Sequence, residues 1–198
     1  MANRLLHKLD IKLHSRIHLN DNDECFYFLE KEAEGFSKSD ANNIIYNFKK
    51  PVDRKGLPEW KHKLRAIHFF TDLLCGIKYP QNTTIIPAPT SKPRNHPQWD
   101  DRIDVAVDGI LKCKQNVRIE KALDTREPQI PAHIGGTRNV DSIMNNTIYT
   151  PLQSNPAMII LVDDVLTTGA HFRAWKNIIE QHNPDSQVIG FFLALHMW

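Results

Sequence analysis

Two adjacent carboxylates, Asp163 and Asp164, stand just ahead of a short turn that contains Thr167, Thr168 and Gly169. Ionised carboxylates only accept hydrogen bonds, so sugar hydroxyls or a Mg²⁺ ion are natural partners for them. Threonine hydroxyls add donors to the backbone N–H groups, and a glycine has no Cβ to keep an anion away from the chain. This order of residue types predicts a site for a phosphorylated sugar, with the acids toward the sugar and the turn toward the phosphate.

The residues around this pair predict a strand, a tight turn and a helix. Residues 158–162 form a continuous apolar run, typical of a strand that is buried on both faces of a parallel sheet, and the strand should stop at the two acids. After the turn, apolar residues recur at helical spacing: Phe172, Trp175, Ile178 and Ile179. Ligands of open α/β sheets bind at the carboxyl ends of strands, and a helix start offers unpaired N–H groups. The predicted elements therefore suit the predicted ligand.

The acidic pair also has two other interpretations. It could be a solvated strand end without a ligand, although neighbouring half-buried carboxylates repel each other and cost stability when they lack a partner. It could instead belong to a Walker B strand of a P-loop ATPase, which also runs from apolar residues into two acids. That fold needs a GxxxxGK[ST] loop, and no glycine of this chain is followed by Lys-Ser or Lys-Thr.

Residues 158–170, MIILVDDVLTTGA, resemble the phosphoribosyl-pyrophosphate (PRPP) binding motif of the type I phosphoribosyltransferases. The resemblance implies that Asp163 and Asp164 are the catalytic acids and hold ribose hydroxyls or Mg²⁺. It assigns ligand contacts to the residues that follow them: Val165, Leu166, Thr167, Thr168, Gly169, Ala170 and His171. The family carries Thr or Ser where this chain has His171, so this side chain either donates in place of a hydroxyl or points outward.

The resemblance extends to a second segment, a basic loop that follows an apolar stretch. Residues 83–89, TTIIPAP, predict a strand, and in the family the loop after this strand holds pyrophosphate. The resemblance therefore makes Ser91, Lys92 and Arg94 candidate contacts of the leaving group, whose growing charge their cations would offset. The alternative for these residues is a solvated basic loop.

Within the family, the chain is most similar to the competence-associated, ComF-like branch. A strand that ends in Pro-x-Pro precedes basic residues there, and the matching positions are Pro87, Pro89, Lys92, Arg94 and Arg102. A later pattern of Thr, Gln and Arg-Asn is matched by Thr125, Gln129, Arg138 and Asn139. The chain departs from this branch in having Ile103 where a glycine is usual, and in lacking the CxxC pairs of an N-terminal zinc ribbon.

The resemblance implies an α/β protein with the Rossmann-like type I phosphoribosyltransferase fold, a mostly parallel sheet flanked by helices. Patterns along the chain agree, with a helix expected at 103–111, strands at 116–123 and 187–195, and a polar excursion at 124–147. By the resemblance, this excursion corresponds to the loop that closes over the family's active site. Gly135 and Gly136 would let the loop move, and Arg126 or Arg138 could contact the phosphates of the ligand. The alternative is a surface loop without function. We expect a core at 81–198 and a small N-terminal hood at 1–80, with a strand at 25–29 and helices that begin at Ser39 and Pro58. The apolar side of the second helix should contain Trp60, Leu64, Ile67, Phe70 or Thr71, and Leu74.

Composition fits an ordinary globular protein. The chain has 198 residues, 41% of them hydrophobic and 24% charged, and a net charge of +2, which argues neither for nucleic acid nor for a membrane surface. No apolar run is long enough to span a bilayer, and the N-terminus lacks the apolar core of a signal peptide. Cys25, Cys75 and Cys113 form no CxxC pair and are expected to be reduced thiols, so we expect a cytoplasmic protein.

Three functions are compatible with these observations. The resemblance implies a Mg²⁺-dependent enzyme in which a nitrogen nucleophile displaces pyrophosphate from the anomeric carbon of PRPP. The second ligand would be a base or nucleotide, and the chain could form a homodimer. A regulatory protein could keep the PRPP or nucleotide pocket without the transfer, as the change at His171 suggests. A nucleic-acid accessory protein could use the basic segment at 49–65, for which a solvated helix face is the alternative.

Overall fold

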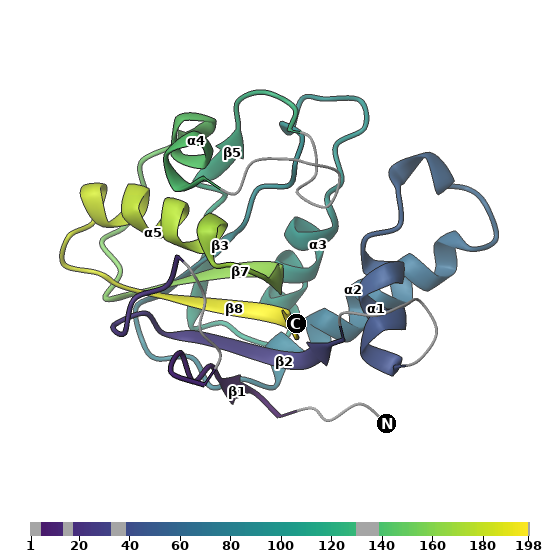
Figure 1. The fold of residues 1–198 in the computed structure, drawn as a ribbon, viewed down its shortest axis with the longest axis horizontal. Coiled ribbons are helices and arrows are strands. Elements are labelled where there is room, and N and C mark those ends of the chain that lie inside the picture. Colours follow the sequence, from purple (N-terminus) through teal and green to yellow (C-terminus); the bar gives the residue numbers. More distant parts are fainter. Residues whose placement is uncertain (1–4, 14–17, 33–38, 130–138, 198) are drawn as a thin grey trace.

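A six-stranded mixed sheet forms the centre of the computed structural model, which describes residues 5–13, 18–32, 39–129 and 139–197 (Figure 1). The strands lie in the order β1 (His7–Lys8), β2 (Cys25–Lys31), β8 (Gln187–His196), β7 (Met158–Leu166), β3 (Thr83–Pro87) and β4 (Val117–Ile119). All neighbours from β2 to β4 are parallel, and β1 runs antiparallel to β2. The expected α/β architecture with a mostly parallel sheet is therefore confirmed.

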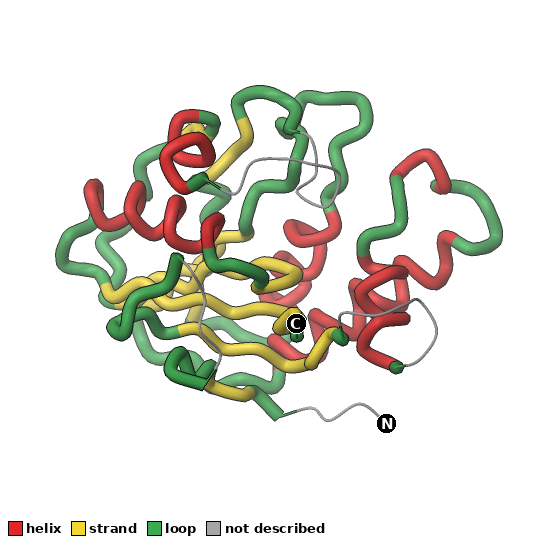
Figure 2. The backbone as a smooth tube through the Cα atoms, viewed as in Figure 1, coloured by secondary structure: helices red, strands yellow, loops and turns green. Residues whose placement is uncertain are grey.

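Helices accompany the sheet on both faces (Figure 2). They are α1 (Asp40–Phe48), α2 (Trp60–Cys75), α3 (Arg102–Asp108), α4 (Val140–Asn145) and α5 (Ala170–His182), with 3₁₀ turns η1 (Val52–Arg54) and η2 (Gly109–Lys112). Phe172 of α5 packs edge-on against Phe192 of β8, with ring centroids 6.1 Å apart. Phe28 of β2 packs in the same way against Phe70 of α2, at 6.2 Å. Because side chains alternate along a strand, these contacts place α5 and α2 on opposite faces of the sheet.

The acidic strand is longer than the sequence predicted. Ile159 to Val162 are fully buried, as expected for a central parallel strand, but β7 does not stop at the acids. It continues through them to Leu166, because β8 goes on pairing with it as far as Leu166 opposite Leu195. On the other side β3 ends at Pro87, opposite Val162. At the two acids, β7 therefore pairs with β8 alone. The strand ends at Leu166, and the prediction that it stops at the acids is wrong.

The ends of β3 and β7 form the point at which the order of the sheet reverses. The chain runs from β3 through α3 to β4 on one side, whereas it runs from β7 through α5 to β8 on the other side. Loops that leave two adjacent strands in opposite directions open a crevice between them, and this is where open α/β sheets bind ligands. The acidic pair and the loop after β3 both lie at this crevice.

Residues before 80 contribute to the sheet itself. β2 pairs with β8 in the middle of the sheet, and α1 packs on α2 through Phe48 and Phe70, with ring centroids 5.7 Å apart. Ser39 begins α1 as predicted, since its hydroxyl accepts a hydrogen bond from the Asn42 backbone at 3.1 Å. β2 is therefore part of the central sheet, and the division into a hood at 1–80 and a core at 81–198 stays a prediction.

The apolar side expected for the helix after Pro58 is wrong at one position. Ile67, Phe70 and Leu74 are buried as predicted, but Leu64 is 43% exposed and the neighbouring Lys63 lies inside. Periodicity alone assigns a lysine to the outer face. Here the amine of Lys63 finds three acceptors in the interior, which offset the cost of removing it from water.

The stretch from Asn116 to Thr147 also differs from its prediction. The expected strand at 116–123 is divided between β4 and β5 (Leu123–Thr125), and β5 pairs with β6 (Thr147–Tyr149) in a separate two-stranded sheet. The polar excursion at 124–147 thus contains α4 and parts of both strands of this small sheet. Gly135, Gly136 and Arg138 of the predicted lid lie outside the described residues, and the backbone of Arg126 bonds to Asn146 at 2.8 Å.

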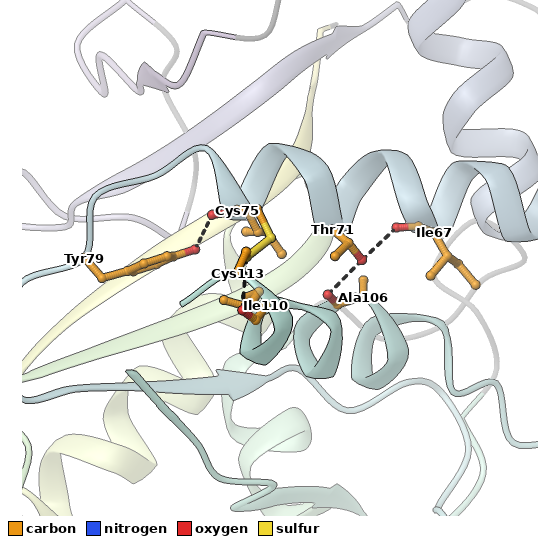
Figure 3. Close-up of a disulfide and its surroundings, with 8 residues drawn as sticks. Ile67, Thr71, Cys75, Tyr79, Ala106, Ile110 and Cys113 are labelled. Atoms are coloured by element: carbon orange, nitrogen blue, oxygen red, sulfur yellow. Dashed lines mark hydrogen bonds between the residues drawn. A yellow bond between two sulfur atoms is a disulfide. The ribbon is translucent and has the colours of Figure 1, made fainter. Parts of the chain in front are cut away.

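Two of the three cysteines are paired, which corrects the expectation of reduced thiols. A disulfide joins Cys75, the last residue of α2, to Cys113, which follows η2 (Figure 3). Cys25 is buried and free. Nearby, Thr71 donates to the carbonyl of Ala106 at 3.0 Å, and a Cβ on Gly109 would come within 2.6 Å of the Thr71 methyl group. This close helix contact brings the cysteines together, although 38 residues separate them in the sequence.

Replacing Cys75 and Cys113 with serine should lower the free energy of unfolding. The bond closes a loop of 38 residues, and the entropy that such a link removes from the unfolded chain corresponds to about 3–4 kcal/mol. Urea unfolding with and without a reducing agent measures the difference. The wild-type midpoint should fall on reduction and the double variant should not respond; a wild-type protein with three titratable thiols in denaturant would contradict the disulfide.

No helix in the described parts of the chain is both long and apolar enough to cross a lipid bilayer. The apolar run near the C-terminus belongs to β8, where its backbone pairs with β2 and β7.

Candidate functional site

The two adjacent acids point to opposite faces of the sheet. Asp163 is in register with Phe192, whose ring contacts α5, so the Asp163 side chain lies on the α5 face. Side chains alternate along a strand, and Asp164 therefore lies on the face of α2 and α3. The sequence placed both carboxylates in one role, but the strand gives them two environments.

Asp164 is held by two cations from separate helices. Its Oδ1 atom is 2.9 Å from the amine of Lys49, at the end of α1, and its Oδ2 atom accepts from Nη2 of Arg102 at 2.7 Å and from Nε at 3.2 Å. The carboxylate is 7% exposed. Burial opposes its ionisation, but Lys49 and Arg102 outweigh burial and hold the pKa of Asp164 well below its usual range. Asp164 is therefore a buried, ionised anchor.

The ion pairs continue beyond Asp164 into the interior. Arg102 also donates to Asp100 at 2.9 Å, and the same Asp100 oxygen accepts from the amine of Lys63 at 2.7 Å. Lys63 is completely buried and donates to the carbonyls of Phe48 and Lys50 as well. We call the chain Lys49–Asp164–Arg102–Asp100–Lys63 the charge network. It ties α1, α2 and the start of α3 to the acidic strand.

Asp163 has fewer hydrogen-bond partners than Asp164 among the described residues. One of its oxygens accepts from the backbone N–H of Asp164 at 2.7 Å, and the described residues provide no other partner for this half-buried carboxyl group. Burial, together with the negative charge of Asp164, raises the pKa of Asp163 from its usual value near 3.8 to about 7. Asp163 therefore retains acceptor capacity for a ligand and changes its charge near neutral pH.

The raised pKa of Asp163 should make stability fall as pH rises. The unfolded chain loses this proton near pH 3.8 and the folded chain near pH 7, so between these values the folded state binds more protons and stability declines. Asp163→Asn cannot titrate. We expect it to be more stable than the wild type above pH 7 by at least about 1 kcal/mol, or roughly 2–4 °C in Tm.

Thermal unfolding of both proteins from pH 4 to pH 8 measures this difference. The advantage of Asp163→Asn should grow through the window and then level off. An advantage that does not depend on pH would contradict the raised pKa.

The turn after β7 leaves the start of α5 without a side-chain cap. Gly169, the residue before the helix, has φ +84° and no side chain to cap it, and no side chain of the described residues accepts from the first N–H groups of α5. These groups have no partner within the helix, and they carry the positive end of its dipole. Thr167 and Thr168 lie beside them, half-buried and buried respectively. The turn thus has backbone donors that an anion could use, and the predicted phosphate contact stays a prediction.

A segment near the N-terminus supports this turn. A Cβ on Gly169 would come within 2.6 Å of the Leu19 side chain, and the backbone N–H of His18 donates to the Thr168 carbonyl at 3.2 Å. The buried carboxylate of Asp23 fixes the segment to α5 by ion pairs with Arg173 and, at 2.9 Å, with Lys176. None of these contacts was expected from the sequence, because they join residues about 150 positions apart.

His171 lies in the first turn of α5, half-buried, with its ring 5.1 Å from the ring of Trp175. Burial lowers the pKa of His171 to about 4, so the imidazole is neutral at physiological pH. A neutral ring keeps one N–H donor and adds no charge to a phosphate site. Its predicted role as a donor stays a prediction. Of the remaining predicted contacts, Leu166 and Ala170 are buried and Val165 is half-buried.

The loop after β3 approaches the crevice, but Arg94 does not point freely into it. Its guanidinium donates to both oxygens of Asp104 at 3.0 Å and to the carbonyl of Leu123 at 2.6 Å. Lys92 bonds to Gln98, a partner that an anion could replace. Ser91 is half-buried, and its backbone carbonyl accepts from the backbone N–H of Gln129 at 2.8 Å. Arg94 therefore positions this loop, and Ser91 and Lys92 remain the candidates for ligand contact.

The carboxylates of the site suit a Mg²⁺ ion that binds as a complex with a ligand. The described residues contain no group of three or more His, Cys, Asp or Glu side chains that could hold a metal ion. Two cations already occupy Asp164, which leaves Asp163 as the carboxylate that could reach a metal. Mg²⁺ commonly binds through one or two carboxylates and substrate phosphates, so this arrangement fits a metal–phosphate complex.

The basic segment at 49–65 is not a uniformly solvated face. Lys63 is buried in the charge network, Lys49 pairs with Asp164, and the amine of Lys50 lies 5.1 Å from the centre of the Tyr46 ring. Arg54, Lys55 and Arg65 are exposed. Several of the cations that the nucleic-acid hypothesis requires at the surface therefore pair with groups of the protein.

Comparison with known proteins adds no relative. No protein-family model matches the sequence, and a search of curated proteins finds no similar one.

Proposed function

We propose that the crevice between β3 and β7 binds PRPP together with Mg²⁺ and that the protein transfers ribose 5-phosphate to a nitrogen nucleophile. The observation that carries this proposal is the combination of a half-buried carboxyl group, Asp163 near the end of β7, with an uncapped helix start at Gly169 just after β7, at the reversal point of the sheet. One end of such a crevice suits sugar hydroxyls and the other suits a phosphate. A resemblance of residues 158–170 to the PRPP motif points to the same ligand, and the type I phosphoribosyltransferase fold is part of the proposal.

Each part of the site has a distinct task in this proposal. Asp163 accepts hydrogen bonds from ribose hydroxyls, and the N–H groups around Gly169 bind the 5-phosphate with Thr167 and Thr168. Ser91 and Lys92 contact the pyrophosphate group. Asp164 keeps its ion pairs with Lys49 and Arg102 and so holds the start of α3 and the end of α1 against the acidic strand.

The transfer requires little proton chemistry from the chain. The bond between the anomeric carbon and the pyrophosphate oxygen breaks, its electron pair leaves with pyrophosphate, and a new bond forms to the nitrogen, which then loses its proton to solvent. Bound Mg²⁺ supplies neutralisation of the leaving group. Positive charge grows on the ribose ring, and ionised Asp163 favours it by proximity. Ligand binding also lowers the pKa of Asp163, because its hydrogen bonds favour the charged form.

A protein that binds PRPP or a nucleotide without transfer is the second candidate. The contacts of Arg94 favour it, since this predicted pyrophosphate cation is already neutralised by Asp104. The neutral His171 in the first turn of α5 points in the same direction, because it replaces a hydroxyl of the family motif.

A thermal-shift screen followed by a pyrophosphate-release assay tests these candidates. PRPP with Mg²⁺ should raise Tm by mass action, and a base or nucleotide added with them should release pyrophosphate. Release by the wild type and none by Asp163→Asn with Asp164→Asn supports the enzyme. Stabilisation without release for any base supports the regulator, and no stabilisation by PRPP contradicts both.

The location of this function stays a prediction. We propose the cytoplasm, because an activated sugar phosphate is too highly charged to cross a membrane unaided. The Cys75–Cys113 disulfide must then persist against a reducing thiol pool, which is uncommon for cytoplasmic proteins. The second ligand is a base or nucleotide, and a homodimer remains open.

A further inference from the structure

The disulfide between Cys75 and Cys113 lies at the protein surface (Figure 3). Cys113, which follows η2, is exposed, whereas Cys75, at the end of α2, is half-buried. Thiol–disulfide exchange requires that a dissolved thiolate reaches one of the two sulfurs, so access decides which sulfur is attacked. The exposed residue gives the easier approach, and we therefore expect exchange to begin at Cys113.

Cations flank the exposed cysteine. Lys112 and Lys114 are its neighbours in the chain; Lys112 is exposed and Lys114 is half-buried. No carboxylate among the described residues pairs with either of them. Unpaired cations attract an anionic molecule more than a neutral one. The surroundings of Cys113 therefore favour an anionic thiol such as glutathione, a tripeptide with more carboxylates than amines.

Hydrogen bonds on both sides of the disulfide hold the two segments together. Thr71 donates to the carbonyl of Ala106 at 3.0 Å on one side, and the Asn116 amide donates to the carbonyl of Tyr79 at 3.0 Å on the other. The Tyr79 hydroxyl in turn donates to the carbonyl of Leu74 at 2.8 Å (Figure 3). None of these bonds needs the sulfurs. The Cα atoms of the two cysteines, 6.0 Å apart, should therefore stay within bonding range when the disulfide opens.

The third cysteine is shielded from the same chemistry. Cys25 lies in β2 with no exposed surface. Burial raises the pKa of the Cys25 thiol, and the thiolate, which is the reactive form, is thereby disfavoured. Because the chain has three cysteines, thiol exchange in the folded protein is confined to the disulfide.

We propose that Cys75 and Cys113 form a reversible modification site, at which a small anionic thiol of the glutathione class opens the disulfide of the folded protein. The thiolate attacks Sγ of Cys113, the S–S bond breaks, and its electron pair leaves on the sulfur of Cys75, which takes a proton from solvent. A second thiolate attacks the glutathione sulfur of this mixed disulfide and releases Cys113 as a thiolate. Two glutathione molecules are thus oxidised to their disulfide while the cysteine pair is reduced.

The state of this site changes how two helices of the charge network are linked. α2 contains Lys63, and α3 begins with Arg102. The disulfide joins the other end of α2 to the segment that follows α3, so opening it removes the covalent link between these helices. Disulfides that form in reducing compartments are usually transient or redox-sensing. The proposal does not depend on PRPP binding or on ribose transfer.

Thiol labelling of the folded full chain tests this proposal. The protein is incubated with reduced glutathione without denaturant, labelled with an alkylating reagent and analysed by peptide mass spectrometry. Cys75 and Cys113 should become labelled and Cys25 should not, a glutathione adduct should appear on Cys113, and oxidised glutathione should close the pair again. The opening rate should stay within about twofold in 1 M urea, whereas opening through global unfolding would accelerate about fivefold or more.

Paired variants test the part played by the cations. Replacing Lys112 and Lys114 with glutamine should slow opening by glutathione about threefold or more at low ionic strength, and should leave opening by the neutral thiol 2-mercaptoethanol within about twofold of the wild type. Lys55→Gln with Lys61→Gln is the matched control. It removes the same charge from exposed positions near the opposite end of α2, so both thiols should react as with the wild type.

Each of four results would overturn the proposal. The disulfide of the folded protein could resist glutathione, or its opening could accelerate with urea as unfolding requires. Oxidised glutathione could fail to close the pair. Finally, loss of Lys112 and Lys114 could leave the reaction with glutathione unchanged or slow both thiols equally, which would contradict a site for an anionic thiol.

Discussion

Replacing Arg102 with methionine is expected to lower the free energy of unfolding by about 3–5 kcal/mol, the range for removing one partner of a buried ion pair. The Arg102 guanidinium, 14% exposed, bridges Asp100 and Asp164. Without Arg102, Lys63 is the cation left to pair with Asp100, and Lys49 is the cation left to pair with Asp164. Each buried carboxylate then accepts fewer hydrogen bonds. Denaturant unfolding at neutral pH measures the loss.

Two further variants separate charge from shape at this position. Arg102→Lys keeps the charge but cannot donate to both acids in the same geometry, so it should recover only part of the stability. Adding Asp164→Asn to Arg102→Met removes the stranded charge and should cost less than the two single losses combined. Equal stability of Arg102→Met and the wild type would show that the charge network does not hold the fold together.

Asp163→Asn and Asp164→Asn are expected to fail in different ways, although the residues are adjacent. Asp163→Asn should weaken binding of PRPP with Mg²⁺ by about 10- to 100-fold, because a charged acceptor of ligand hydroxyls is lost. Its fold should be retained, since the described residues give this carboxyl group no cation partner. Asp164→Asn should instead destabilise the protein, because Lys49 and Arg102 lose a shared anion.

Asp185→Asn is the matched control for both variants. Asp185 is exposed in the turn before β8, away from the crevice, and its replacement should change neither binding nor stability. Thermal unfolding with and without PRPP and Mg²⁺ gives both quantities for all three proteins. Identical behaviour of Asp163→Asn and Asp164→Asn would contradict the assignment of the two acids to opposite faces.

Local patterns predicted the central part of the site well. The apolar run of β7, the turn at Gly169 and the buried side of α5 were expected from residues that are close in sequence, and the structure has all three. The strand end was missed because it depends on β8, whose pairing carries β7 on to Leu166. A strand's length is set by its neighbours, which no local pattern contains.

The electrostatic partners could not be predicted in the same way. Lys63 occupies a position that helical periodicity leaves to solvent, and its buried amine reaches Asp100, 37 residues away. Arg94 was expected to face a ligand, but Asp104 of α3 lies near enough to take its guanidinium. Cys75 and Cys113 are paired because α2 and η2 are in contact. All three depend on tertiary contacts that spacing alone does not contain.

Calorimetric titration of the wild-type protein with PRPP in the presence of Mg²⁺ tests the central claim most directly. We predict saturable binding to one site per chain, competed by ribose 5-phosphate and by pyrophosphate, and strongly weakened in Asp163→Asn but not in Asp185→Asn. Absence of binding to the wild type, or equal binding by Asp163→Asn, would contradict the assignment of the crevice between β3 and β7 as a PRPP site.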